Sequence, residues 1–193
     1  MAERGVQIDH ATLNRWVIKY SPDIAKTAQI RKHPTVGAWR MDETYIKVKG
    51  KWMYLYRAID KYGKTLDFML SRRRDETAAR LFFRRAIETN GLPSKIVIDK
   101  SGANLAGLEW INVGLKFSRT KQRIEILCVK YLNNIIEQDH RFIKKITHPT
   151  LGFKAFRSAA ATLAGIEVAH MIRKQQIQSN HMSPFEQFAS LAA

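Results

Sequence analysis

Residues 38–71 read AWRMDETYIKVKGKWMYLYRAIDKYGKTLDFMLS and contain three strand-like runs separated by two short turns. The runs are rich in aromatic and β-branched residues, which fit the pleated surface of a sheet. They span residues 38–48, 52–59 and 65–71. Because the turns at Lys49-Gly50 and residues 60–63 are too short for a crossover, the strands are expected to form an antiparallel meander.

The residues after this meander alternate between helical and strand-like patterns. Apolar residues recur at helical spacing over 75–89, 133–146 and 153–176, with 103–116 as an ambiguous further short helix. Short apolar runs predict two more strands at residues 95–98 and 124–130. The order predicts an α/β fold in which a mixed five-stranded sheet carries helices on both faces.

The residues before the meander predict one helix and a connection. Residues 9–20 are expected to form a helix capped by Asp9. Ser21-Pro22 is expected to end it, since the residue before a proline avoids the helical conformation. The basic stretch 23–37 is then expected to be a linker.

The charge balance points to a polyanionic partner. The chain carries 33 Lys and Arg against 17 Asp and Glu, a formal net charge of +16. Because such an excess repels itself in a compact domain, nucleic acid is the first candidate partner and a membrane surface the rival. No stretch approaches the roughly 20 apolar residues of a spanning helix, and the N-terminus lacks the apolar core of a signal peptide.

The cysteine content restricts the kinds of metal site. Cys128 is the only cysteine, so neither an internal disulfide nor a Cys/His zinc cluster is expected. A reducing, intracellular location is the default interpretation. Any metal is expected to use oxygen ligands, which suit Mg²⁺ or Mn²⁺.

Three acidic residues stand where catalytic carboxylates often lie. Asp42 lies on the first strand, Asp99 at the carboxyl end of the strand 95–98, and Glu137 in the first turn of the helix after the last strand. If the first and fourth strands are neighbours, Asp42 and Asp99 meet at the sheet edge and the Glu137 helix closes the site. Such carboxylates could hold two divalent cations roughly 3.5–4 Å apart, as in two-metal phosphoryl transfer.

Each acid also has a structural interpretation that spacing alone leaves open. Asp99 could be a turn or capping residue, Glu137 could complete a capping box with Asn134, and Asp42 could pair with a lysine on the next strand. Three other acids could be chosen in their place: Asp60, Asp67 and Asp139.

Five segments resemble bacterial transposases of the insertion-sequence-six family. They read RGVQIDHATLNRWVIKYSP, WRMDETYIKVKGKWMYLYRAIDKYGKTLDFMLS, IDKSGAN, VKYLNNIIEQDHRFIKK and GFKAFRSAAATLAGIEVAHMIRK. The resemblance covers nearly the whole chain and implies a DDE catalytic domain with a ribonuclease H-like fold. It also implies that Asp42, Asp99 and Glu137 are the catalytic triad and hold two Mg²⁺ (or Mn²⁺) ions.

The same resemblance implies which residues bind DNA. Lys144 matches the basic residue that often follows the glutamate, and on a helix Arg141 and Lys145 share its face with Glu137. An ion pair between Arg141 and Glu137 is the alternative. Residues 9–20 match the recognition helix of a helix-turn-helix, and this match implies that three further residues bind DNA: Asn14, Arg15 and Lys19. The helices that would support the recognition helix are missing from the sequence.

The expected division of the chain follows from the resemblance. A partial helix-turn-helix DNA-binding remnant spans 1–22, a basic linker 23–37, the ribonuclease H-like catalytic domain 38–176 and a C-terminal tail 177–193.

The implied function is metal-dependent DNA strand cleavage and strand transfer of an insertion sequence. Its DNA partners would be the terminal inverted repeats of the element and the target DNA, bound by a homo-oligomer, with no membrane partner. The implied location is the bacterial cytoplasm, in association with the nucleoid. Two other hypotheses stay open: a truncated, non-catalytic DNA-binding relic or inhibitor of a full-length transposase, and a stand-alone nuclease of the ribonuclease H type.

Overall fold

The computed structural model describes residues 5, 7–35, 37–117, 122–129, 133–178 and 182–192. The chain divides into two compact units. We call His33–Gly152 the sheet unit, and Met1–Lys32 with Phe153–Ala193 the helical unit. The expected boundaries of the catalytic domain, 38–176, stay a prediction.

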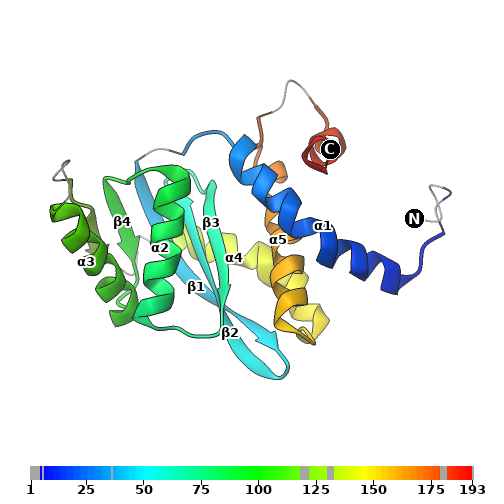
Figure 1. The fold of residues 1–193 in the computed structure, drawn as a ribbon, viewed down its shortest axis with the longest axis horizontal. Coiled ribbons are helices and arrows are strands. Elements are labelled where there is room, and N and C mark those ends of the chain that lie inside the picture. Colours follow the sequence, from blue (N-terminus) through cyan, green and yellow to red (C-terminus); the bar gives the residue numbers. More distant parts are fainter. Residues whose placement is uncertain are drawn as a thin grey trace. The chain divides into compact units, whose positions relative to one another are not determined.

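The sheet unit contains one five-stranded sheet with the order β3-β2-β1-β4-β5 (Figure 1). Its strands are β1 Ala38–Val48, β2 Lys51–Asp60, β3 Thr65–Ser71, β4 Lys95–Ile98 and β5 Glu125–Cys128. The first three pair antiparallel, whereas β4 pairs parallel with β1 and β5 pairs parallel with β4. The mixed sheet and its meander, both expected from the sequence, are confirmed.

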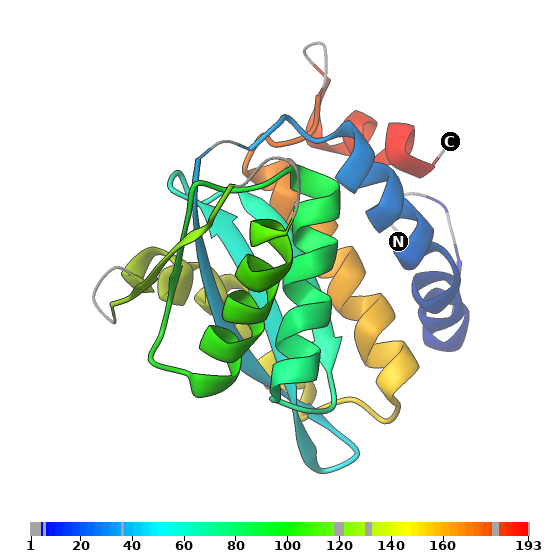
Figure 2. The same ribbon diagram turned by 60° about the vertical axis from the view of Figure 1, so that its left-hand side comes forward.

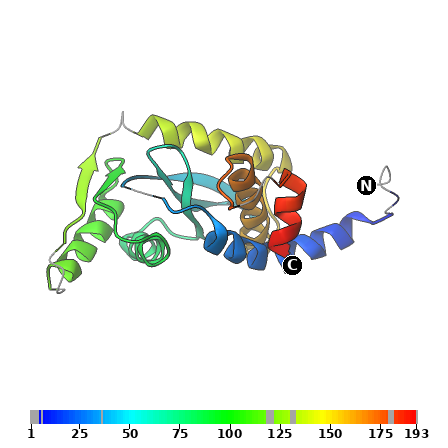
Figure 3. The ribbon, with the colours of Figure 1, turned by 90° about the horizontal axis from the view of Figure 1, so that it is seen from above.

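Helices cover both faces of this sheet. On one face α2 (Glu76–Asn90) and α3 (Gly102–Lys116) lie side by side (Figure 2) and bury the main apolar core against the strands. On the opposite face α4 (Asn134–Thr147) contacts β1 (Figure 3), and the short 3-10 helix η3 (His148–Thr150) follows it. The segment that was ambiguous from the sequence, 103–116, lies within α3, a full helix of 15 residues.

The helical unit corrects one expectation from the sequence. Its first helix, α1 (His10–Arg31), continues through Pro22 instead of ending there. Ser21 lies so close to α5 (Phe156–Arg173) that a Cβ on Gly165 would come within 2.9 Å of the Ser21 hydroxyl. The apolar residues after Pro22, namely Ile24, Ala25 and Ala28, are buried, and α1 packs against α5. The free energy gained by this burial therefore outweighs the loss of the helical hydrogen bond that a proline removes.

The last residues of the chain also contain a helix, α6 (Pro184–Ala192), where a tail was expected. The helix begins with a capping box, because the Ser183 backbone N–H donates to the Glu186 carboxylate (2.7 Å) and the Glu186 N–H donates to the Ser183 hydroxyl (3.3 Å). The sequence Ser-Pro-Phe-Glu at 183–186 carried this signal. Across the part of the chain that the structure describes, no helix is long and apolar enough to cross a membrane.

Two glycines of α3 should respond oppositely to substitution by alanine. At Gly107 a Cβ would lie 3.0 Å from the Ala79 Cβ and 3.2 Å from the Arg80 backbone nitrogen, whereas at Gly114 it would meet nothing within 4 Å. We expect Gly107→Ala to lower the free energy of unfolding by about 1–3 kcal/mol through overpacking against α2. Gly114→Ala should raise it by about 0.4–1 kcal/mol through lost backbone entropy of the unfolded chain.

Urea denaturation of both variants measures the two changes. Shifts of the same sign in both would contradict the close α2–α3 packing at Gly107.

Candidate active site

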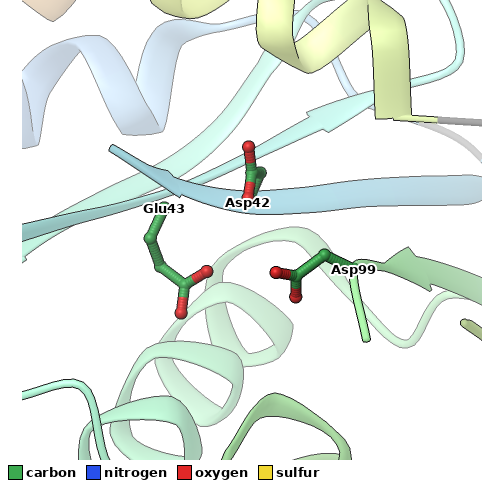
Figure 4. A group of neighbouring side chains, drawn as sticks. All are labelled: Asp42, Glu43 and Asp99. Atoms are coloured by element: carbon green, nitrogen blue, oxygen red, sulfur yellow. The ribbon is translucent and has the colours of Figure 1, made fainter. Parts of the chain in front are cut away.

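Asp42 and Asp99 meet at the carboxyl end of β4. The parallel pairing of β1 with β4 runs from Ala38 to Arg40, where Arg40 is level with Val97. Asp42 comes two residues after Arg40, and Asp99 comes two residues after Val97. The same register therefore places the two carboxylates beside each other. The edge of β1 is open at this point, and both side chains reach it (Figure 4).

All three acids proposed from the sequence line one cavity of about 700 Å³. Asp42 and Asp99 form its sheet side, and Glu137 lies on its helical side in the first turn of α4. Two cations, Arg74 and Lys100, also line the wall. The cavity therefore combines carboxylates with basic groups, which is the composition that a phosphodiester flanked by metal ions requires.

A fourth acid, Glu43, belongs to the tightest cluster of carboxylates. One ligand oxygen each from Asp42, Glu43 and Asp99 lies within 4.8 Å of the others (Figure 4). Glu137 lines the same cavity but is not part of this closest group. Carboxylate oxygens at such spacing are the donors that a hard divalent cation prefers.

Arg74 holds part of this cluster together. Its Nε donates to one Glu43 oxygen at 3.2 Å, and its Nη2 donates to the other at 3.4 Å and to the Asp99 carboxylate at 3.1 Å. The Asn104 amide adds a third hydrogen bond to Glu43 at 3.2 Å.

These contacts shift the pKa values of Glu43 and Arg74. Burial raises the pKa of Glu43, while the hydrogen bonds from Arg74 and Asn104 oppose the rise. Burial lowers the pKa of Arg74, but the hydrogen bonds to Glu43 and the negative charges of Glu43 and Asp99 together outweigh this, so the pKa is raised overall. Arg74 is therefore a permanent positive charge within the acid cluster, and it offsets the repulsion between the carboxylates.

Asp42 faces a buried histidine on its other side. The Nε2 atom of His140 lies 3.3 Å from an Asp42 oxygen, and its Nδ1 lies 3.2 Å from an Arg57 nitrogen. Because a guanidinium can only donate, Nδ1 must accept, so the neutral ring carries its proton on Nε2, towards Asp42. This contact departs from ideal hydrogen-bond alignment, so it acts mainly as an electrostatic guide for the carboxylate.

The charge state of His140 agrees with that tautomer. Burial lowers its pKa, the Asp42 carboxylate opposes this, and the Arg57 charge lowers the pKa further. Arg57 itself is fully buried and donates to Asp139 at 2.7 Å. A buried chain of contacts thus runs from Asp139 through Arg57 and His140 to Asp42.

The three alternative acids have structural roles in the sheet unit. Asp60 accepts two backbone N–H bonds of its own turn, at 2.8 and 2.9 Å. Asp67 accepts two hydrogen bonds from Arg85, both at 2.8 Å. Asp139 is the partner of Arg57.

Of the structural interpretations of the three proposed acids, the structure supports the one for Asp99 and not those for Glu137 and Asp42. Asp99 does accept the Ser101 backbone N–H at 3.1 Å, as a turn aspartate would. Asn134 is the first residue of α4 and not its cap, so the capping box with Glu137 is absent. The cross-strand neighbour of Asp42 is an arginine, and the structure records no lysine ion pair with it among the residues described.

The residues expected to bind DNA are all exposed: Asn14, Arg15 and Lys19 on α1, and Arg141, Lys144 and Lys145 on α4. Both Glu137 and Arg141 are described, and no ion pair between them is found. The ion pair that was the alternative interpretation of Arg141 is therefore not formed.

Sequence reasoning missed Glu43, Arg74 and His140. Strand alternation places Glu43 on the face opposite Asp42, and only the open edge of β1 lets both carboxylates reach Asp99. Arg74 stood within a run of three arginines that gave no hint of a partner. His140 did carry a signal, since it stands three residues after Glu137 and therefore near the same helix face.

Comparisons with known proteins agree with this geometry. A family model described as a DDE domain matches residues 36–176. The transposase of the insertion sequence-like element IS431mec from Staphylococcus aureus is 38% identical over 180 residues, which cover 93% of this chain and 77% of that protein. The transposase of element IS257 in transposon Tn4003, from the same species, is also 38% identical, over 91% of this chain and 75% of its own length.

Solved structures of retroviral integrases share the fold. The catalytic core domain of HTLV-2 integrase, in its dimeric form with magnesium, has a TM-score of 0.54 at 14% identity and covers 82% of this chain and 99% of its own. The BIV integrase core has a TM-score of 0.50 at 15% identity, over 79% and 93% of the two chains. The expected ribonuclease H-like fold is confirmed.

The family model and the transposases of S. aureus both match most of the chain's length. The chain therefore belongs to the insertion-sequence-six family of DDE transposases, which are DNA-acting polynucleotidyl transferases.

Proposed function

We propose that this cavity cleaves and transfers DNA strands, with Asp42, Asp99 and Glu137 as its metal ligands. The observation that carries the proposal is the convergence of three acids from β1, the end of β4 and α4 on one cavity. The net charge of +16 supports DNA as the substrate, because phosphates would neutralise it.

The donor atoms fit two Mg²⁺ or Mn²⁺ ions. All three proposed ligands are carboxylates, and the related integrase core was solved in complex with magnesium. Held by Asp42, Asp99 and Glu137, two such ions would supply activation of the attacking oxygen and stabilisation of the leaving oxygen of a phosphodiester. No protein nucleophile is needed, since positioning and electrostatics carry this class of transfer.

The surrounding residues orient the ligands. The Nε2–H of His140 guides the Asp42 carboxylate, and Arg57 fixes the His140 tautomer from behind. Arg74 holds Asp99 at its Oδ2 atom while remaining tethered to Glu43. A cation at Asp99 would compete with this single bond, and the two bonds to Glu43 would keep the guanidinium at the cavity wall.

As the third metal ligand, Glu137 is a better candidate than Glu43. The Glu43 side chain is only 3% exposed and already accepts three hydrogen bonds, from Arg74 and Asn104. Glu137 is exposed at the cavity wall, and no hydrogen bond or ion pair of its carboxylate is recorded among the described residues. We therefore assign Glu43 to anchoring Arg74 and Glu137 to the metal.

The proposed DNA partners are the terminal inverted repeats of the element and its target, and the proposed active form is a homo-oligomer on DNA. Asn14, Arg15 and Lys19 would contact the repeats, and Arg141, Lys144 and Lys145 the phosphates near the cavity. Association with the nucleoid would follow from this affinity. The relic hypothesis has no observation in its favour, since all three acids are present and line one cavity.

Asp99→Asn should abolish chemistry while sparing DNA binding. We expect Mg²⁺- or Mn²⁺-dependent nicking and joining of element-end DNA to fall by at least about a hundredfold, because a lost metal ligand removes several kcal/mol of transition-state stabilisation. Asp23→Asn, at an exposed carboxylate 3.4 Å from Lys26, serves as the control and should retain full activity. Equal activity of wild type and Asp99→Asn would contradict the proposal, and cleavage of an RNA–DNA hybrid without joining would favour the nuclease hypothesis.

The third ligand can be identified by comparing two glutamine variants. Glu137→Gln should weaken Mn²⁺ binding, measured by titration calorimetry, by about tenfold or more, since even residues behind the ligands often change affinity by that factor. Glu43→Gln should leave Mn²⁺ affinity nearly unchanged and lower the unfolding midpoint instead. The reverse result would make Glu43 the ligand.

DNA binding should weaken steeply with salt. If binding neutralises 6–10 phosphates, raising the salt concentration from 50 to 200 mM should reduce the affinity by a factor of about 10³–10⁵. Replacing Lys144 and Lys145 with Gln should reduce the slope of log K against log salt by roughly 2. Lys26→Gln is the control, because its ammonium already faces Asp23. A flat salt response in fluorescence anisotropy would refute phosphate contacts as the source of affinity.

A further inference from the structure

The β1–β2 hairpin carries aromatic side chains on the face of the sheet that α2 and α3 cover nearer the middle of these strands. Figure 1 and Figure 2 both show the hairpin extending beyond the end of α2. Cross-strand register places Lys47 opposite Trp52 and Tyr45 opposite Tyr54. Directly opposed residues share a face of the sheet, so these four form one surface, which we call the aromatic strip.

Two rings of this strip are exposed and Tyr54 is half-buried, whereas the other face of β1 is buried here. Tyr45 is 51% exposed and Trp52 60%, whereas Thr44, Ile46 and Val48 are at most 2% exposed. The rings contact one another, with centroids 6.2 Å apart for Tyr45–Trp52 and 5.5 Å for Tyr45–Tyr54. A contiguous exposed aromatic cluster of this kind marks a binding surface.

The charge of the hairpin favours an anionic ligand. Lys47 lies on the strip itself, Lys49 in the turn and Lys51 just after it, and residues 44–59 contain no acid. Aromatic faces combined with lysines are the elements that bind unpaired nucleotides, by stacking on the bases and pairing with the phosphates. An apolar surface of a second copy would leave these lysines without a counter-charge.

The strip is continuous with the acid cluster. Tyr45 stands two residues after Glu43 on the same face of β1. From Asp42 to Tyr45 the strand advances roughly 10 Å, about three nucleotides of a stacked strand. A DNA strand whose phosphate lies at Asp42 can therefore reach the strip within a few nucleotides.

We propose that the aromatic strip of Tyr45, Lys47, Trp52 and Tyr54 binds unpaired nucleotides next to the scissile phosphate, by stacking on their bases and contacting their backbone through Lys47. This inference rests on the proposed function, because the acid cluster locates the phosphate. It makes the strip a nucleotide-binding subsite that selects DNA with locally unpaired bases.

The test measures binding to a labelled single-stranded oligothymidine by fluorescence anisotropy, with the full chain and in EDTA. Trp52→Ala should weaken binding by about tenfold, while Trp52→Phe should retain most of it. Affinity for a duplex of equal length should change less. Tyr62→Ala is the matched control, because this tyrosine is 73% exposed in the β2–β3 turn, away from the strip.

Three results would overturn the proposal. They are unchanged single-strand affinity in Trp52→Ala, an equal loss in Tyr62→Ala, and dissociation of a DNA-free oligomer by Trp52→Ala in sedimentation velocity, which would make the strip a contact between copies. Because binding in EDTA needs no metal, failure of the strip and failure of the proposed catalytic site give different results.

Discussion

Repulsion between neighbouring carboxylates is the constraint around which the sheet unit is organised. Asp42, Glu43 and Asp99 bring ligand oxygens within 4.8 Å of one another, which is unfavourable unless a positive charge accompanies them. Arg74 supplies that charge by bonding to Glu43 and Asp99 at once. Arg74 therefore offsets part of the repulsion within this cluster.

The same constraint explains the buried contacts behind Asp42. A carboxylate at an open strand edge could adopt several orientations, and the His140 ring limits them from the α4 side. Arg57 and Asp139 cost free energy to bury, but together they settle which ring nitrogen carries the proton. Charges that contribute little net stability can therefore contribute positional accuracy at the proposed metal site.

The sheet also connects the acid cluster to a surface suited to DNA. The short β4 pairs with β1 only up to Arg40, so β1 continues without a neighbour on that edge and then extends into the hairpin. One long strand thereby carries Asp42, Glu43 and Tyr45 in succession. Chemistry and the proposed nucleotide binding share a single rigid element, which suits an enzyme that works by positioning its substrate.

Local patterns in the sequence were sufficient for the meander and for α2 and α4, because strand alternation and helical spacing act over a few residues. The family resemblance selected Asp42, Asp99 and Glu137 as candidates, and the structure brings all three to one cavity. The local patterns failed at Pro22, where packing of α1 on α5 outweighs a local helix-ending signal. They also could not find Arg74 bound to Glu43 or Arg57 behind His140, since side chains distant along the chain meet only in the folded protein. The sequence by itself determined the candidate acids, the excess of positive charge and the order of the elements. Only the tertiary structure decided which cations accompany the acids, because strand register and burial select those partners.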